Sequence, residues 1–248
     1  MACAACRAPA APEPPTGPSL SEVRQQLSAR EVRLGGYDVE GEILEGSHRA
    51  GFSFSFRPPQ RLQGRVHGPT AQTLSFDGRT FFQRDDATGA LQVTPLEERP
   101  ADEVSQTLHA VFGSFVAEGW RAPLLPSSTK ARAVAHPKGP EAVELAVDPD
   151  GTGALRVVYV LRWPSMDFLE KRLEQRGGPT GGIRMESEQC EADRNLCVPT
   201  AWSHVSNGVT AASVRLTQVR LGANVQPVEF TLPTPSVREP AAEAADGP

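Results

Sequence analysis

The sequence lacks the features that mark a membrane-spanning or nucleic-acid-binding protein. Its 248 residues contain no apolar run near the roughly 20 residues that a transmembrane helix needs. Basic residues are in the minority, with 25 Lys and Arg against 30 Asp and Glu, and they form no patch. Because phosphate backbones are bound by clustered positive charge, we expect no nucleic-acid partner.

Motifs of the common enzyme classes are also missing. There is no Gly-x-Ser-x-Gly elbow, no pair of histidines at helical spacing and no phosphate-binding loop with Lys before Ser or Thr. The five histidines are scattered singly, and the stretch DPDG (148–151) lacks the later carboxylate of a calcium loop, so it predicts a turn. We therefore expect no enzymatic activity, no cofactor and no bound metal ion.

The chain has only four cysteines, and two of them, Cys190 and Cys197, flank six residues that read as a turn. Two cysteines alone make a poor zinc site, which needs about four ligands. A disulfide across a hairpin fits better, and two buried free thiols are the alternative. A disulfide would agree with an oxidising compartment such as the bacterial periplasm.

Residues 1–18 contain small residues up to Cys6 and then a Pro-rich run. The stretch is similar to the end of a bacterial lipoprotein signal, although Cys3 stands where an aliphatic residue is usual. Cys6 would then be the lipidated residue, and the Pro-rich run would be an extended tether at a membrane. The alternative is an ordinary disordered leader.

Residues 19–235 are expected to form one folded domain, and the Ala/Glu/Pro-rich residues 236–248 a disordered tail. Ser19 and Glu22 have capping-box spacing and predict a short amphipathic helix. From residue 37 to residue 95 the apolar period is two, which predicts an antiparallel meander of six strands. A second amphipathic helix is predicted within 101–119 and a third helical piece over 164–175, with strands at 130–136, 141–147, 153–163, 182–190, 197–205, 210–221 and 228–232.

The stretch FSFSFRPPQRLQGRV (52–66) places three phenylalanines on alternate positions of a strand, and so on one face of the sheet. With neighbouring strands in register, that face would line the concave side of a curved sheet, and the second helix would cover it. The candidate ligand contacts on the sheet are Phe52, Phe54, Phe56, Leu62, Val66, Leu74 and Phe76, and those on the helix are Val104, Leu108, Phe112 and Phe115. For each of them a plain core role is the alternative.

Two stretches carry a family resemblance. The segment from Phe54 to Leu96 has a strand that ends in Arg-Pro, then Asp-Gly-Arg-Thr and an aromatic pair, and residues 212–235 have an alternating strand followed by Asn, Phe-Thr-Leu and Pro. Both resemble the LolA/LolB superfamily of periplasmic lipoprotein carriers and outer-membrane lipoprotein receptors.

The resemblance implies a mainly β (α+β) fold, in which a strongly curved antiparallel sheet of about eleven strands forms an incomplete barrel lidded by helices. It implies non-enzymatic binding of lipid or lipoprotein acyl chains by a monomer, with another envelope transport protein as a candidate partner. The location would be the periplasmic side of the outer membrane, through a lipid anchor at Cys6, or the soluble periplasm. It also assigns Arg57 as a latch that bonds carbonyls of the lid helices. A structural envelope lipoprotein with the same fold and no lipid cargo is the alternative function.

Overall fold

The computed structural model describes residues 17–58, 61–68, 71–99, 104, 120, 122–123, 125–149, 151–178 and 180–222. Within these residues no helix combines the length and the apolar character needed to cross a bilayer. The leader up to residue 16, the tail from 223 and most of the predicted second helix lie outside them. What the sequence predicts for these three segments therefore stays a prediction.

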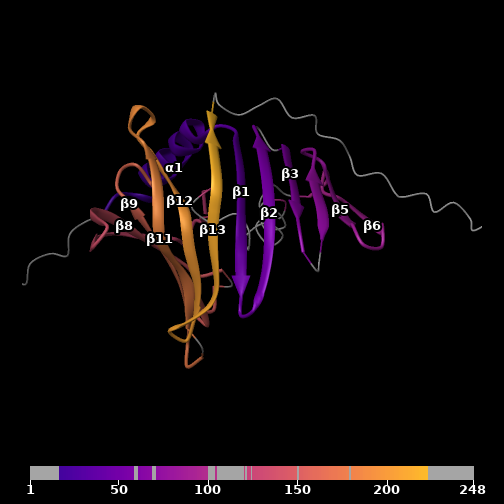
Figure 1. Ribbon diagram of the computed structural model, residues 1–248. Helices are drawn as coiled ribbons and strands as arrows, with labels where there is room; N and C mark the ends of the chain where they lie inside the picture. The colour runs from indigo at the N-terminus through magenta and orange to yellow at the C-terminus, as the bar shows by residue number, and fades with distance from the viewer. Residues whose placement is uncertain are drawn as a thin grey trace, which may run out of the picture.

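The described chain is dominated by one antiparallel sheet of 13 strands (Figure 1). The strands are β1 (Tyr37–Glu45), β2 (His48–Arg57), β3 (Arg61–Val66), β4 (Gln72–Phe76), β5 (Thr80–Asp85), β6 (Leu91–Pro95), β7 (Lys130–His136), β8 (Gly139–Val147), β9 (Leu155–Arg162), β10 (Phe168–Gln175), β11 (Gly181–Glu191), β12 (Leu196–Ser206) and β13 (Val209–Leu221). Their spatial order is β6-β5-β4-β3-β2-β1-β13-β12-β11-β10-β9-β8-β7. The first and last strands therefore pair in the middle, β6 and β7 form the edges, and the sheet stays open as the predicted incomplete barrel.

Helix α1 (Leu20–Leu34) begins as the sequence predicts. The hydroxyl of Ser19 accepts a hydrogen bond from the Glu22 N–H at 3.3 Å, and the Glu22 carboxylate accepts one from the Ser19 N–H at 2.8 Å. This reciprocal capping box satisfies backbone donors that the first turn leaves free. The helix buries Val23, Leu27 and Leu34 in the core.

Helix α1 runs across strands at one end of the sheet (Figure 1). Just before the helix, a Cβ added to Gly17 would lie within 3 Å of the β7 backbone, so this segment and β7 are in close contact. Near its end, the guanidinium of Arg30 donates to the carbonyl of Cys197 in β12 at 3.2 Å. One helix thus ties together two strands that lie five positions apart in the sheet.

The predicted helical piece at 164–175 is wrong, because Phe168–Gln175 is strand β10, paired with β9 and β11. The Leu, Glu, Lys and Arg residues there favour a helix by propensity. However, Glu170, Arg172 and Glu174 stand at every second position, which is the period of a strand. Arg172 lies 3.6 Å from each of the two carboxylates, so the period of two makes an ion-pair ladder on one face of the sheet. Strand pairing and this ladder override local propensity.

The strand count is 13 rather than about eleven. The predicted strands from residue 37 to residue 221 correspond to β1–β9 and β11–β13, and β10 adds the segment that was expected to be helical. The predicted strand at 228–232 lies outside the described residues. The antiparallel order and the open edge agree with the predicted architecture.

Candidate functional site

The structure brings together the apolar face that the sequence predicts. In the register of β2, β3 and β4, Phe56 lies opposite Leu62, which lies opposite Phe76. The sheet residues of the predicted contact set, apart from half-buried Phe56, are each 2% exposed or less and belong to the central core: Phe52, Phe54, Leu62, Val66, Leu74 and Phe76. They pack against one another, so they form a filled wall.

An open pocket lies beside this wall, where the end of β2 meets α1. Its volume is about 540 Å³. The described residues that line it come from the last turns of the helix, from the Arg-Pro end of β2 and from one tryptophan: Ser28, Glu31, Val32, Leu34, Gly35, Phe56, Pro58 and Trp120. Of the predicted sheet contacts, Phe56 is the one that reaches this pocket.

Two of the lining residues, Phe56 and Trp120, are aromatic and both contact the buried ring of Tyr37. The ring of Tyr37 stacks on Phe56 with a centroid distance of 5.2 Å and packs against Trp120 at 4.8 Å. Trp120 is 1% exposed, and its indole N–H donates to the carbonyl of Pro199 at 3.2 Å. The tryptophan is therefore fixed by a satisfied polar group while its apolar ring faces the pocket.

The outer rim of the pocket carries Val32 and Glu31 of α1. Val32 is 82% exposed, so it lies at the edge of the pocket that faces the solvent. The Glu31 carboxylate accepts a hydrogen bond from the Ala122 N–H at 3.1 Å and so connects the helix to the segment after Trp120. Sequence reasoning missed these α1 residues and Trp120, since it assigned the pocket to the sheet and the second helix.

Arg57 lies next to the pocket, at the end of β2. Its Nη1 atom donates to the carbonyls of Phe56 at 2.8 Å and Tyr37 at 3.2 Å, and to the Asp38 carboxylate at 2.8 Å. These bonds join β2 to β1 at the pocket edge. The latch stays a prediction, because Leu108, Phe112 and Phe115 of the predicted lid lie outside the described residues. The predicted lipidation site, Cys6, also lies outside them.

Val104 is the one lid residue that is described. It is helical and half-buried, and it packs against the core.

The predicted disulfide between Cys190 and Cys197 is confirmed. The two residues lie directly opposite each other in β11 and β12 and are bonded. Together with Glu188 they make the one described cluster whose side-chain geometry could hold a metal ion. The bond removes both thiolates, so the cluster does not offer the ligands that zinc requires.

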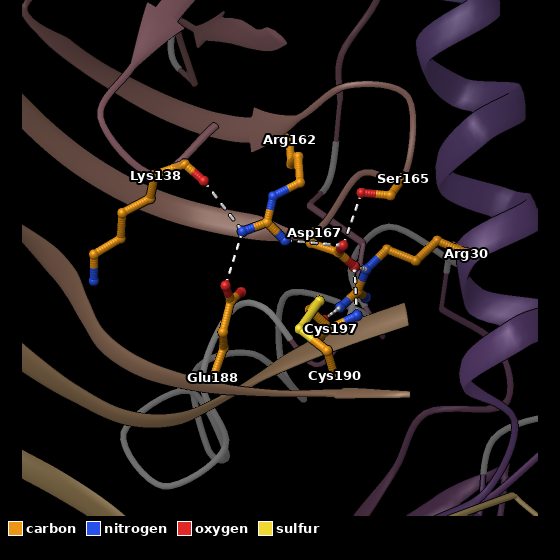
Figure 2. Close-up of a disulfide and its surroundings, with 8 residues drawn as sticks. All are labelled: Arg30, Lys138, Arg162, Ser165, Asp167, Glu188, Cys190 and Cys197. Carbon is orange, nitrogen blue, oxygen red and sulfur yellow. Dashed lines mark hydrogen bonds and ion pairs between the residues drawn. A yellow bond between two sulfur atoms is a disulfide. The ribbon is translucent and has the colours of Figure 1, made fainter. Parts of the chain in front are cut away.

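Beside the disulfide, a buried carboxylate joins α1 to two parts of the sheet (Figure 2). Asp167, with a side chain 3% exposed, accepts from the Ser165 hydroxyl at 2.7 Å and from the Cys197 N–H at 3.0 Å. Its oxygens also lie 3.5 Å from the Arg30 guanidinium and 3.3 Å from that of Arg162. Burial lowers the pKa of Arg30, and the nearby Asp167 carboxylate opposes that shift.

A second buried carboxylate, Glu144 of β8, sits among arginines. It accepts from Arg132 at 2.8 Å and from Arg172 at 2.6 Å, and Arg156 lies 3.8 Å away. Burial alone would raise the pKa of Glu144, but the hydrogen bonds and charges of Arg132 and Arg172 outweigh it and hold that pKa below its ordinary value of 4.5. A carboxylate held in its ionised form stabilises the sheet and is a poor proton donor near neutral pH.

The Glu144→Gln variant should therefore lose about 1.5 to 3 kcal/mol of unfolding free energy at pH 7. Because the folded-state pKa is lowered, this contribution is present above pH 4.5 and is lost as the pH falls through the folded value. The difference in unfolding free energy between wild type and variant, measured by urea unfolding, should then become smaller from pH 7 to about pH 3. Glu45→Gln, at an exposed position, is the control, and a difference that does not change with pH would contradict the role given to Glu144.

This chain is similar to known proteins in its fold. No protein-family model matches the sequence, and neither does any curated protein. A proposed outer membrane lipoprotein-sorting protein domain from Vibrio parahaemolyticus has a TM-score of 0.54 at 10% identity, over 83% of this chain and 93% of that chain. A LolA superfamily protein from Nitrosomonas europaea has a TM-score of 0.50 at 11% identity, over 84% of this chain and 97% of that chain. A DUF1329 family protein from Desulfovibrio piger has a TM-score of 0.50 at 9% identity, over 85% of this chain and 96% of that chain. The chain therefore has a LolA-like fold.

Proposed function

We propose that the protein binds an acyl chain of a lipid or a lipoprotein in the pocket between α1, the end of β2 and Trp120, without catalysing a reaction. The observation that carries the proposal is the pocket itself. Its volume of about 540 Å³ is in the range of small-molecule sites, and its described lining is mainly apolar. An apolar chain would gain free energy from leaving water there, at about 25 cal/mol per Å² of buried surface.

The proposed location follows from the same reading. A LolA-like fold and a hairpin disulfide are both consistent with the periplasm, where disulfides persist. Lipidation at Cys6 would hold the protein at the periplasmic side of the outer membrane. Without it the protein would be soluble in the periplasm.

The charged variant Val32→Glu tests the pocket with little risk to the fold. Val32 is 82% exposed in the last turn of α1, where a negative charge is mildly unfavourable next to the free carbonyls of the helix end, so stability should change by less than about 1 kcal/mol. A carboxylate at the rim is a poorer neighbour for an apolar chain than valine is, so we expect a several-fold loss of affinity for a pyrene-labelled alkyl alcohol, measured by fluorescence titration.

The matched control is Val209→Glu. Val209 is also an exposed valine, at 69%, but it stands at the start of β13 and is not among the residues that line the pocket. It should bind the probe like wild type. Equal affinity in wild type and Val32→Glu would place any binding elsewhere and defeat the proposal.

The packed sheet face favours a second candidate, a structural envelope protein without lipid cargo. Six of the seven predicted sheet contacts are buried residues of one core cluster, so almost none of their surface is accessible to a ligand. Native mass spectrometry of protein purified from the periplasm separates the two. Lipid adducts that Val32→Glu reduces would favour the carrier, and a lipid-free protein that also ignores the probe would favour the scaffold.

A further inference from the structure

The loop that the disulfide closes carries an arginine that bonds the end of α1. Between Cys190 and Cys197 the chain makes a short 3-10 turn, Ala192–Arg194. The Nη2 atom of Arg194 donates to the carbonyl of Arg33 and, at 3.3 Å, to that of Leu34. The last carbonyls of a helix have no partner within the helix, and they carry partial negative charge, so a guanidinium is a fitting donor there.

The surroundings of Arg194 leave room for this contact. A Cβ added to Gly222, at the end of β13, would lie 2.5 Å from Nη1 of Arg194. A Cβ on Gly35 would lie 3.6 Å from Nη2. The guanidinium therefore lies between two glycines, and the carboxylate of Glu191, at 3.4 Å, orients it from within the loop.

The other end of the loop bonds the same helix through a backbone group. The carbonyl of Cys197 accepts from Arg30 at 3.2 Å, and its N–H donates to Asp167 at 3.0 Å, as Figure 2 shows beside the disulfide. Loop 190–197 thus bonds α1 at residues 30, 33 and 34. Each of those positions is next in sequence to a residue that lines the pocket or is itself one, since Glu31, Val32, Leu34 and Gly35 are all lining residues.

We propose that loop 190–197 is a clamp on the C-terminal half of α1, that Arg194 is its positioning residue, and that the Cys190–Cys197 bond maintains its grip. The disulfide adds a covalent link to a hairpin end in which Glu191 already pairs with Leu196, and Arg194 on the turn between them must be held in one conformation to reach the helix. The clamp thereby sets the position of the helical wall of the pocket. Its effect on ligand affinity rests on the function proposed above, but its hold on the helix does not.

A dithiol reductant releases the clamp in a balanced step. The reductant passes two electrons and two protons to the protein, the bond between the two sulfur atoms breaks, and Cys190 and Cys197 become thiols while the reductant forms its own disulfide. The hydrogen bonds of Arg194 and of the Cys197 carbonyl to α1 then come from a hairpin end that is no longer covalently closed. A pocket wall that responds to reduction would couple binding to the redox state of the compartment.

Hydrogen exchange of the intact protein tests the clamp directly. In Arg194→Ala, in the double variant Cys190→Ala/Cys197→Ala and in reduced wild type, amides of residues 31–35 should exchange about tenfold faster than in oxidised wild type, since bonds to a charged donor are lost or weakened. Amides of β3 (61–66) serve as the internal reference and should stay protected, which separates local release from unfolding.

Arg49→Ala is the matched control, because Arg49 has a side chain 67% exposed and makes a surface ion pair with Glu42 in the β1–β2 hairpin. It should leave exchange at residues 31–35 unchanged. Equal exchange of these amides in oxidised wild type and Arg194→Ala would overturn the clamp, and equal exchange in the oxidised and reduced states would overturn its redox dependence.

The binding arm uses the pyrene-labelled alkyl alcohol. If wild type binds it, Arg194→Ala and the reduced protein should bind it several-fold more weakly, and Arg49→Ala should bind it as wild type does. Unchanged affinity in Arg194→Ala would remove the link between clamp and pocket. If wild type does not bind the probe, the proposed function fails, while the exchange result still decides the clamp.

Discussion

Replacing Asp167 by alanine is expected to lower the free energy of unfolding by about 3 to 5 kcal/mol, which is the cost of removing one partner of a buried ion pair. The side chains of Arg30 and Asp167 are each 3% exposed, so the variant would leave the guanidinium of Arg30 buried without its carboxylate. It would also remove the acceptor of the Ser165 hydroxyl. Arg162 is less affected, because it keeps Glu188 at 2.8 Å.

Urea unfolding measures the effect, with Glu42→Ala as the control. Glu42 pairs with Arg49 at 3.7 Å, but both side chains are about half exposed or more, so this variant should cost less than about 1 kcal/mol. The double variant Arg30→Met/Asp167→Leu should recover part of the loss, since it removes the unpaired charge of Arg30, while the Ser165 hydroxyl and the Cys197 N–H still lack their acceptor. An Asp167→Ala protein within about 1 kcal/mol of wild type would mean that water or rearrangement compensates the guanidinium.

The sheet could be predicted from the sequence because its signals are local. An apolar period of two marks β1–β6 without any knowledge of their neighbours, and Ser19 with Glu22 marks the start of α1. The disulfide could be predicted because its two cysteines flank one turn. Strand β10 was missed for the complementary reason, since its Glu, Lys, Arg and Leu residues satisfy both periods and only pairing with β9 and β11 decides between them.

The pocket and the clamp could not be predicted, because they depend on contacts between distant segments. Arg194 bonds carbonyls that precede it by 161 and 160 residues, and no local pattern distinguishes it from the other arginines. Trp120 joins the pocket through packing on Tyr37 and a hydrogen bond to Pro199. The family resemblance implies an arginine that bonds helix carbonyls and assigns Arg57 to that role, which stays a prediction. In the described residues, Arg194 makes such bonds with α1.

Phe54→Ala is expected to destabilise the protein by about 3 to 5 kcal/mol, because the ring is 2% exposed in the middle of the core. The ring has a specific partner. Gly64 lies directly opposite Phe54 in β3, and a Cβ added there would lie 1.9 Å from Cε1 of the ring. The backbone of Gly64 does not have a positive φ, so the glycine is required by the space that Phe54 fills. Gly64→Ala should therefore cost about 1 to 3 kcal/mol through overpacking.

The two substitutions should compensate each other in a double-mutant cycle measured by urea unfolding. Once Phe54→Ala has removed the ring, Gly64→Ala should cost almost nothing, which gives a coupling energy above about 1 kcal/mol. Gly51→Ala is the control, because a Cβ there meets nothing closer than 3.8 Å, so the variant should differ from wild type by less than about 1 kcal/mol. Additive losses in the cycle would contradict the direct contact. Compensation would instead explain why a glycine in β3 stands opposite a large ring of β2. Phe54 lies over Gly64 and fills the wall next to the pocket, and Phe56, at the end of the strand, is the ring of β2 that lines the pocket.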